Sequence, residues 1–577
     1  MASKPAAKKD AFNMFNAIKF YIDKLVKEPA LDGGKVLLLD PITTKIVSTV
    51  YSQTQILEQE VYLVELLGKP HENMAHFKAA VFVQPTANNI KLLKDEIREP
   101  KFSEYHIFFS NVVPTDLMSE LAKADEFEVI KSVQEFYADF MAVNEDFFHL
   151  GANNTISLSS PKSRSLASGS IHDRNVNGIL SVLLSLKRKP SQIRYQRESA
   201  LAGRIASDLV SKIENDGIFD FRRQENGGPL LLLLDRRDDP ITPLLTQFTY
   251  QAMIHELIGI NDSRVKFPKK TPNISKDMQE IVVSSTQDAF FSKMKHAHMG
   301  DLGVAVKKLM DDYQKQAKKN DTISSIEDMQ AFMERYPAFR SQSINASKHV
   351  TLMSELMRLT DKNSLLQISE LEQDIAITTD HSSHKQQLLE KIESSRVANS
   401  DKLRLALLYR LKYEDYNESK EIKSILSSNG VGSKGLRLLD SVIDYAGDGK
   451  RAPGLFTVSI ASKLENVFNA MTGGVSGMEN HYTQHQPLLY NILDSILKGK
   501  LKDSAFPLAN DSKKSSSGDV SKPSEIIVFI VGGATFEEAT KIAAFNAANP
   551  SMKVLLGGSC VHNSVSFLKE IEDNFGH

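Results

Sequence analysis

The stretch Gly227–Ile260 constrains the fold of this 577-residue chain more than any other. Its five consecutive leucines, Leu230–Leu234, have the length and apolarity of a strand that is buried on both faces. The charged cluster Asp235–Asp239 follows at once, so it must lie where that strand leaves the sheet. Strands of this kind are typical of parallel sheets covered by helices on both sides, which indicates an α/β fold.

The charged cluster consists of Asp235, Arg236, Arg237, Asp238 and Asp239. Its three acids and two arginines nearly balance, and it holds no histidine, cysteine or lysine that could act as a nucleophile or a tunable base. We therefore expect a structural cluster of arginine–carboxylate pairs at Asp235, Arg236 and Asp239. The alternative is a metal-dependent α/β hydrolase or phosphotransferase that holds Mg²⁺ with these carboxylates.

The overall composition excludes several classes of protein. Lys and Arg number 70 against 72 acidic residues, so no global charge draws the chain to nucleic acid. The longest apolar runs fall short of the roughly 20 residues that span a bilayer, and the N-terminus lacks the apolar core of a secretory signal. The single cysteine, Cys560, excludes an internal disulfide and fits a reducing compartment. We expect a cytoplasmic protein.

The first part of the chain reads as one α/β domain, residues 1–140. From Asp10 to Leu25, apolar residues recur at steps of three and four, which predicts a helix with one apolar face. Short apolar runs then alternate with segments that suit helices, a pattern that predicts a parallel sheet. The predicted strands are Val36–Leu39, Val61–Val64, Ala79–Val83 and Ile107–Phe109.

A second α/β domain follows, and it is interrupted. The serine-rich segment Thr155–Ser170 predicts a mobile surface loop. After Leu230–Leu234, the next clear strands are Ile526–Val531 and Val554–Leu556, and the material between them has mainly helical patterning. We therefore expect residues 141–250 and 485–577 to form one discontinuous α/β domain, with a mainly helical domain, 251–484, inserted into it.

The remaining motifs indicate binding more than catalysis. After the strand at Ile526–Val531, a Gly-Gly turn leads into a helix that starts with Glu537 and Glu538, and these acids disfavour a bound phosphate. His481 and His485 have the spacing of a metal-binding helix face, but no third ligand is evident. We expect no enzyme activity, no catalytic residue, no metal and no cofactor.

Several segments resemble the SM family, the cytosolic syntaxin-binding regulators of SNARE-mediated membrane fusion. Ser284–Phe291 and His481–Leu489 are most similar to its endosomal member, and relatives of other subgroups often carry tryptophan around Phe291, where this chain has none. The family segments are Val182–Tyr195, Leu230–Ile260, Ser325–Phe339 and Val531–Ala539.

The resemblance implies a fold and a function. The fold is a three-domain arch with two parallel-sheet α/β domains and a mainly helical, SNARE-binding domain inserted in the second. The function is that of a non-enzymatic SM-type SNARE chaperone that binds a syntaxin of the endosome or trans-Golgi. It would promote correct SNARE complex assembly and vesicle fusion in Golgi-to-endosome and vacuole transport. The protein would be a monomer that reaches Golgi and endosomal membranes only through its SNARE.

The resemblance also implies site residues. Many family members bind the short N-terminal peptide of a syntaxin on the first domain, and Ile130 and Val133, three apart, have the spacing of one helix face there. Glu135 would lie at the rim and pair with a basic peptide residue. Pro337 matches a proline in the helical hairpin that contacts SNARE helices, or it marks an ordinary helix end. The matching peptide-pocket positions are Val113, Leu117, Met118, Ile130, Val133 and Glu135.

Overall fold

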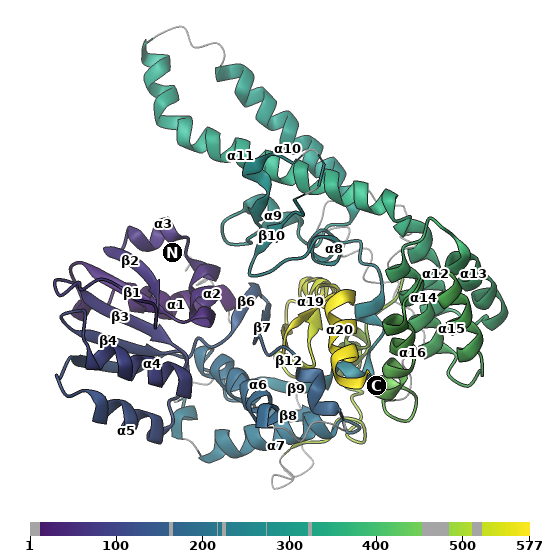
Figure 1. The fold of residues 1–577 in the computed structure, drawn as a ribbon, viewed down its shortest axis with the longest axis horizontal. Helices are drawn as coiled ribbons and strands as arrows, with labels where there is room; N and C mark the ends of the chain where they lie inside the picture. Colours follow the sequence, from purple (N-terminus) through teal and green to yellow (C-terminus); the bar gives the residue numbers. More distant parts are fainter. Residues whose placement is uncertain are drawn as a thin grey trace, which may run out of the picture.

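The computed structural model describes residues 12–576 except 161–165, 216, 222–226, 270, 273, 321–325, 453–483 and 510–521. In Figure 1 the first α/β domain and a helical region stand on either side of a second, central sheet. A pair of long helices projects from the helical region. The expected three-part arch with two α/β sheets is confirmed.

The first sheet has five parallel strands in the order β2-β1-β3-β4-β5. Successive residues of its strands face opposite cores: Leu37 packs with α1 and α2, and Leu38 with α4 and α5. Burial on both faces explains the continuous apolar runs, and the four strands expected here are confirmed. The elements are α1 Met14–Val26, β1 Lys35–Leu39, α2 Pro41–Val50, α3 Gln53–Leu57, β2 Val61–Leu66, β3 Lys78–Val83, α4 Ala87–Arg98, β4 Tyr105–Phe109, α5 Thr115–Ala124 and β5 Ile130–Glu135.

The second sheet joins distant parts of the chain in the order β6-β7-β14-β12-β9-β8. Strand β12 lies in parallel beside β9, with Ile526 opposite Leu230 and Val531 opposite Asp235. Because β9 lies between two strands and between two cores, all six of its residues are buried. The elements are β6 Met141–Asn144, β7 Phe147–His149, α6 Leu166–Ser185, β8 Gln192–Tyr195, α7 Ala200–Asn215, β9 Leu230–Asp235, α18 Leu488–Leu497, β12 Glu525–Val531, α19 Phe536–Ala548 and β14 Lys553–Gly558.

The helical region fills the interval between β9 and β12, with two small two-stranded sheets at its margins. The last helix, α20, comes from the C-terminal segment but packs in the core of this region, where Phe567 and Phe575 meet Tyr445 of α16 edge to face. The elements are α8 Tyr250–Leu257, β10 Arg264–Lys266, β11 Glu280–Val282, α9 Ala289–Met294, α10 Met299–Asn320, α11 Ile326–Lys362, α12 Leu365–Ile377, α13 His381–Glu393, α14 Asn399–Lys412, α15 Ser419–Ser428, α16 Ser433–Ala446, β13 Ala534–Thr535, β15 Val561–His562 and α20 Ser564–Phe575.

The expectation of a mobile surface loop at Thr155–Ser170 is wrong over much of its length. Residues Thr155–Ser159 form the 3-10 helix η2, in which Thr155 and Ile156 are buried, and α6 already begins at Leu166. The polar composition was misleading because the serine-rich segment lies against the C-terminal helix, where Ser160 donates to the carbonyl of Asn574. Buried hydrogen bonds of this kind offset the cost of removing hydroxyl groups from water.

Within the described ranges, none of the helices is both long and apolar enough to cross a membrane.

Candidate functional site

The six positions expected to bind a syntaxin peptide gather at one edge of the first sheet. Leu117 and Met118 of α5 and Ile130 of β5 pack against the same core, to which the buried Val113 belongs. Val133 is paired with Ile107, a residue of that core, so its side chain lies on the α5 side of the sheet. These side chains therefore share one surface between α5 and the edge strand β5.

The expectation that Ile130 and Val133 share a helix face is wrong, because both lie on strand β5. Residues three apart on a regular strand point to opposite faces. Here the register against β4 shifts between the first two pairs, Tyr105 with Ile130 and His106 with Ser132. This irregularity adds one residue to β5, which places Ile130 and Val133 on the same side of the sheet.

The surface between α5 and β5 retains exposed apolar area. Leu117, Met118 and Ile130 are half-buried, and Val133 is 37% exposed. Phe127, in the loop between α5 and β5, is 62% exposed. Scattered apolar residues on a surface are ordinary, but a group of them beside an edge strand is a place where a peptide side chain can bind.

Glu135 lies at the rim of this surface and has a partner inside the protein. Its carboxylate accepts a hydrogen bond of 2.8 Å from the backbone N–H of Val113, which fixes the segment leading into α5. Burial and the neighbouring Glu135 raise the pKa of Tyr137. The carboxylate thus has a structural role, and its pairing with a basic peptide residue stays a prediction.

The charged cluster after β9 is built around Arg236. Its guanidinium donates to both carboxylate oxygens of Glu538, at 2.9 Å each, and lies 3.6 Å from Asp239. Glu538 also completes a capping box with Thr535 at the start of α19. The pair therefore connects the end of β9 to the helix that follows β12, across the junction between the two chain segments.

Two acidic members of the cluster, Asp235 and Asp239, accept hydrogen bonds from neighbouring donors. Asp235 accepts from the Ser199 hydroxyl at 2.5 Å and from the N–H of Arg237. Asp239 accepts from Thr242 and from the N–H of Leu488. Carboxylates in use as hydrogen-bond acceptors for the protein itself are poorly placed to hold Mg²⁺ with its shell of water, so the geometry disfavours the hydrolase alternative.

Two carboxyls of the cluster have opposite pKa shifts. Burial, with a further contribution from the nearby Asp235, raises the pKa of Asp238 to about 7. Burial also opposes ionisation of Asp239, but the Arg236 charge offsets it and holds the pKa below its usual value. Asp238 keeps one buried oxygen, Oδ2, without a hydrogen-bond partner, which is consistent with a protonated carboxyl.

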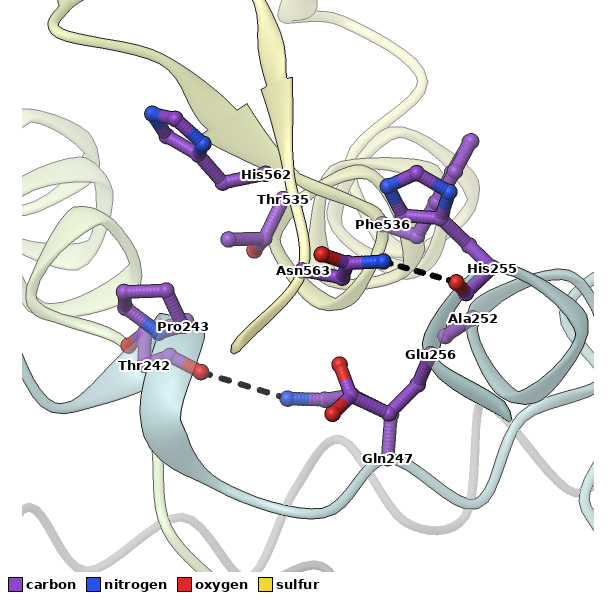
Figure 2. Close-up of a pocket in the computed structure, with 10 residues that line it drawn as sticks. All are labelled: Thr242, Pro243, Gln247, Ala252, His255, Glu256, Thr535, Phe536, His562 and Asn563. Carbon is purple, nitrogen blue, oxygen red and sulfur yellow. Dashed lines mark hydrogen bonds between the residues drawn. The ribbon is translucent and has the colours of Figure 1, made fainter. Parts of the chain in front are cut away.

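A small cavity of about 10 Å³ lies between α8 and the C-terminal segment (Figure 2). His255 and His562 line it, and burial lowers the pKa of these imidazoles to about 4 and about 3, so both are neutral near pH 7. The Asn563 amide donates to the carbonyl of His255 across one side. The volume is below the range of drug-sized ligand sites, and no serine, cysteine or lysine lines the cavity as a nucleophile.

The long helices α10 and α11 form the projecting hairpin (Figure 1). Pro337 lies inside α11, so the helix does not end there. His481, the first histidine of the pair considered for metal binding, lies outside the described residues. His485 is buried, and its backbone N–H donates to the side chain of Gln373.

Asp288 fixes the base of α11, a role for which no local pattern of residues is a signal. Its carboxylate binds Lys348 and, at 3.0 Å, His349 of α11, while it also caps α9 at Phe291. Tyr250 of α8 completes the network through a 2.8 Å hydrogen bond to His349. Burial opposes ionisation of Asp288, but the hydrogen bonds and charges of His349 and Lys348 hold its pKa below the usual value.

Comparisons with known proteins agree with this fold and these motifs. The Sec1 family model matches residues 35–570. Vacuolar protein sorting-associated protein 45 of Dictyostelium discoideum is 41% identical, covering 96% of both chains, and its counterpart of Homo sapiens is 41% identical, covering 97% of this chain and 96% of that one. The solved SM protein Vps45 in complex with the Qa SNARE Tlg2 is 39% identical, with a TM-score of 0.88 and 98% of each chain covered. The resemblance to the SM family, and within it to this member, is confirmed.

Proposed function

Because this chain belongs to the Sec1 family of SNARE regulators, which are not enzymes, we propose that it is an SM-type SNARE chaperone. It binds a syntaxin-type Qa SNARE of the endosome or trans-Golgi and promotes correct SNARE complex assembly and vesicle fusion. The observation that carries the proposal is the likeness, over 98% of both chains, to a Vps45 structure solved with the Qa SNARE Tlg2.

The first contact is proposed to be a short, reversible anchor on the first domain. The N-terminal peptide of the syntaxin places one Leu or Phe side chain against Leu117, Met118 and Ile130, beside the exposed Val133. Burial of that side chain contributes about 1.5–3 kcal/mol. Such a gain suits a contact that is made and released during SNARE assembly.

The second contact with the SNAREs is proposed to be made by the helical region, where the α10–α11 hairpin aligns SNARE helices. Support for this role comes from the fixed base of the hairpin, where Asp288 holds Lys348 and His349. A rigid base and a long projecting helix pair keep the hairpin at a defined angle to the arch (Figure 1). The protein acts as a monomer at Golgi and endosomal membranes, which it reaches through the membrane-anchored SNARE.

The test is a pull-down of the cytosolic part of an endosomal syntaxin, with and without its first twenty or so residues. We expect the intact syntaxin to be retained and the shortened form to bind more weakly, because the peptide contributes one of two contacts. Equal retention of both forms would exclude the peptide surface but not the chaperone. Failure to retain either form would instead favour a tethering scaffold and overturn the proposed function.

Calorimetry with Mg²⁺ and a nucleotide tests the enzyme alternative. A SNARE chaperone whose cluster carboxylates are occupied by protein donors gives no binding heat. Heat that disappears when Asp235 is changed to Asn would support a phosphotransferase.

A further inference from the structure

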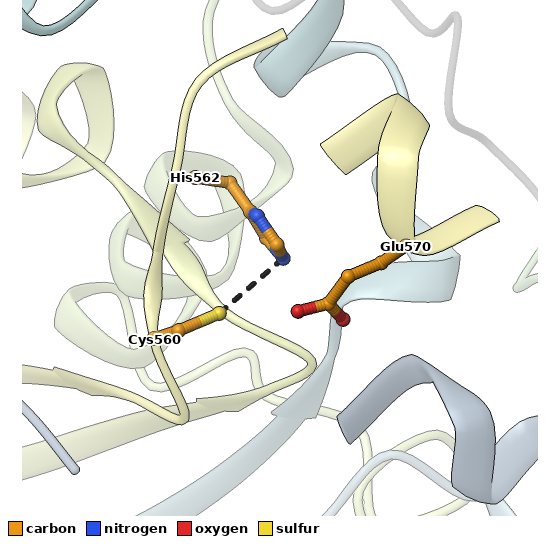
Figure 3. A group of neighbouring side chains, drawn as sticks. All are labelled: Cys560, His562 and Glu570. Atoms are coloured by element: carbon orange, nitrogen blue, oxygen red, sulfur yellow. Dashed lines mark hydrogen bonds between the residues drawn. The ribbon is translucent and has the colours of Figure 1, made fainter. Parts of the chain in front are cut away.

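Cys560, His562 and Glu570 bring three kinds of metal-ligand atom to one buried point (Figure 3). The thiol sulfur, an imidazole nitrogen and a carboxylate oxygen all lie within 4.8 Å of one another. The closest pair is Sγ of Cys560 and Nε2 of His562, at 3.4 Å. Cys560 and His562 belong to the segment around β15, and Glu570 belongs to α20.

His562 and Glu570 are each held by a further hydrogen bond that leaves one atom directed to the cluster. Nδ1 of His562 lies 3.0 Å from the Ser566 hydroxyl, so Nε2 faces Cys560. Oε1 of Glu570 accepts a 2.6 Å hydrogen bond from the N–H of Asn154. Its second oxygen, Oε2, is buried and accepts no well-formed hydrogen bond. Metal-binding histidines and carboxylates are held in this way by neighbouring groups.

The spacing is close to that of a zinc site. Zinc–sulfur bonds of about 2.3 Å and zinc–nitrogen bonds of about 2.0 Å in a tetrahedron place the ligand atoms about 3.5 Å apart. The Cys560–His562 pair already has this separation. The carboxylate of Glu570 needs to approach by up to about 1.3 Å, which rotation of its side chain can supply.

We propose that Cys560, His562 and Glu570 form a binding site for a zinc ion. One thiolate, one neutral imidazole and one carboxylate are a ligand set that favours Zn²⁺ over Mg²⁺ or Ca²⁺. The thiolate and the carboxylate together balance the two positive charges of the ion. The nearby charge of Arg236 is already compensated by Glu538 and Asp239.

On one side, the backbone at residue 533 packs closely against the cluster. Residue 533 is glycine, and a Cβ there would lie 2.8 Å from the Cys560 sulfur and 2.5 Å from the His562 ring. His562 also lines the small cavity beside α8 (Figure 2). Bound zinc would tie the second sheet to α20 and thus to the core of the helical region.

The chain offers a sharp spectroscopic test because Cys560 is its single cysteine. We expect Co²⁺, added to the reduced full-length protein as a probe for zinc, to give a near-ultraviolet sulfur-to-cobalt absorption band at one ion per chain. Zn²⁺ should remove the band by competition and raise the midpoint of thermal unfolding. Glu570→Gln, which keeps an acceptor for Asn154, should weaken Co²⁺ binding at least tenfold.

Matched variants separate the site from loose binding at the surface. Glu572→Gln, on the same helix, should bind Co²⁺ as the parent does, and Cys560→Ser should lose both the band and the zinc-dependent stabilisation. Absence of the band in the parent protein would overturn the proposal. If Glu570→Gln and His562→Gln both show the band and bind Co²⁺ with the affinity of the parent, the proposal is also overturned, since the metal would then bind the thiol alone.

Discussion

At the scale of single residues, the second sheet is joined to its surroundings by charged groups removed from water. Arg236 is fully buried, and its bidentate contact with Glu538 satisfies both carboxylate oxygens. Burying such a pair costs solvation energy that its attraction only partly offsets, but removing one partner leaves an isolated buried charge and typically costs about 3–5 kcal/mol. The pair is therefore better understood as specifying how the two chain segments join than as a net source of stability.

Asp238 gives a pH-dependent prediction. Its pKa is about 7 in the folded protein, above the usual value, so the folded state prefers the protonated carboxyl. The contribution of this group to stability is complete at low pH and is lost as the pH rises from about 4 through about 7. Asp238→Asn should thus gain stability relative to the parent over that interval, on the order of 4 kcal/mol.

The measurement is the midpoint of thermal unfolding of both proteins between about pH 4 and pH 8. Asp239→Asn is the control, because the pKa of Asp239 is lowered and its charge stabilises the fold above the unfolded-state pKa. It should destabilise the protein at pH 8. Parallel pH profiles of Asp238→Asn and the parent would contradict the assignment of a raised pKa.

Leu117 is the residue on which the proposed peptide surface depends most directly. Leu117→Arg should abolish binding of the syntaxin N-terminal peptide, because a charged group would replace apolar area beside Met118 and Ile130. The fold should survive, since the side chain is only half-buried and a long arginine can turn to solvent. Peptide titration by calorimetry measures the effect.

Leu57→Arg provides a control at another exposed apolar residue of the same domain. It should leave peptide affinity unchanged. Unchanged affinity in Leu117→Arg would show that the peptide binds elsewhere.

At the scale of elements, α11 is a long helix that contains a proline. Pro337 cannot donate the backbone hydrogen bond that an interior helix position normally makes, and prolines inside helices generally crowd the preceding turn. The helix nevertheless runs from Ile326 to Lys362. Its base is fixed by the contacts of Lys348 and His349 with Asp288, and a hinge at Pro337 stays a prediction.

Pro337→Ala should stabilise α11 and strengthen SNARE assembly. Alanine restores the missing donor and has a helix propensity about 3 kcal/mol more favourable than proline. Hydrogen exchange should slow across residues 325–350, and assembly of the SNARE complex should be faster in a fusion or binding assay. Exchange identical to that of the parent would argue against a hinge at this position.

At the scale of the whole molecule, the C-terminal segment holds two parts of the protein together. Its strand β12 pairs with β9 in the second sheet, and its helix α20 packs in the core of the helical region. The chain therefore cannot complete either part before its last residues are in place. Long-range contacts of this kind make the arch a cooperative unit even though it has several cores.

Phe567→Ala should destabilise helix α16 of the helical region, although Phe567 lies more than 100 residues away in the sequence, on α20. Phe567 is fully buried against Tyr445 of α16, and truncation of a buried phenylalanine costs about 3–5 kcal/mol. Hydrogen exchange should increase in α16 but not in α4 of the first domain. Val565→Ala, at a 65% exposed position of the same helix, should change neither. An effect confined to α20 would show that the two parts are not coupled.

Sequence periodicity predicted most of the layered architecture. The apolar runs at Val36–Leu39, Ala79–Val83 and Leu230–Leu234 identified the buried parallel strands, because a strand covered on both faces needs apolar residues throughout. Short or partly exposed strands were missed. Apolar and polar residues alternate only weakly in Ile130–Glu135, and the bulge puts Ile130 and Val133 three apart on one side, which is also the spacing of a helix face. Its identification as a strand therefore depends on its pairing with β4.

The chain by itself determined the long buried strands and the family, since these follow from local patterns and motifs. Tertiary structure alone decided which distant groups meet: Arg236 with Glu538, Asp288 with Lys348 and His349, and Cys560 with Glu570. No local pattern specifies such partners, because a charge or a ligand atom selects its neighbour by the geometry of elements that are far apart in sequence. The contacts that join the arch are therefore properties of the fold.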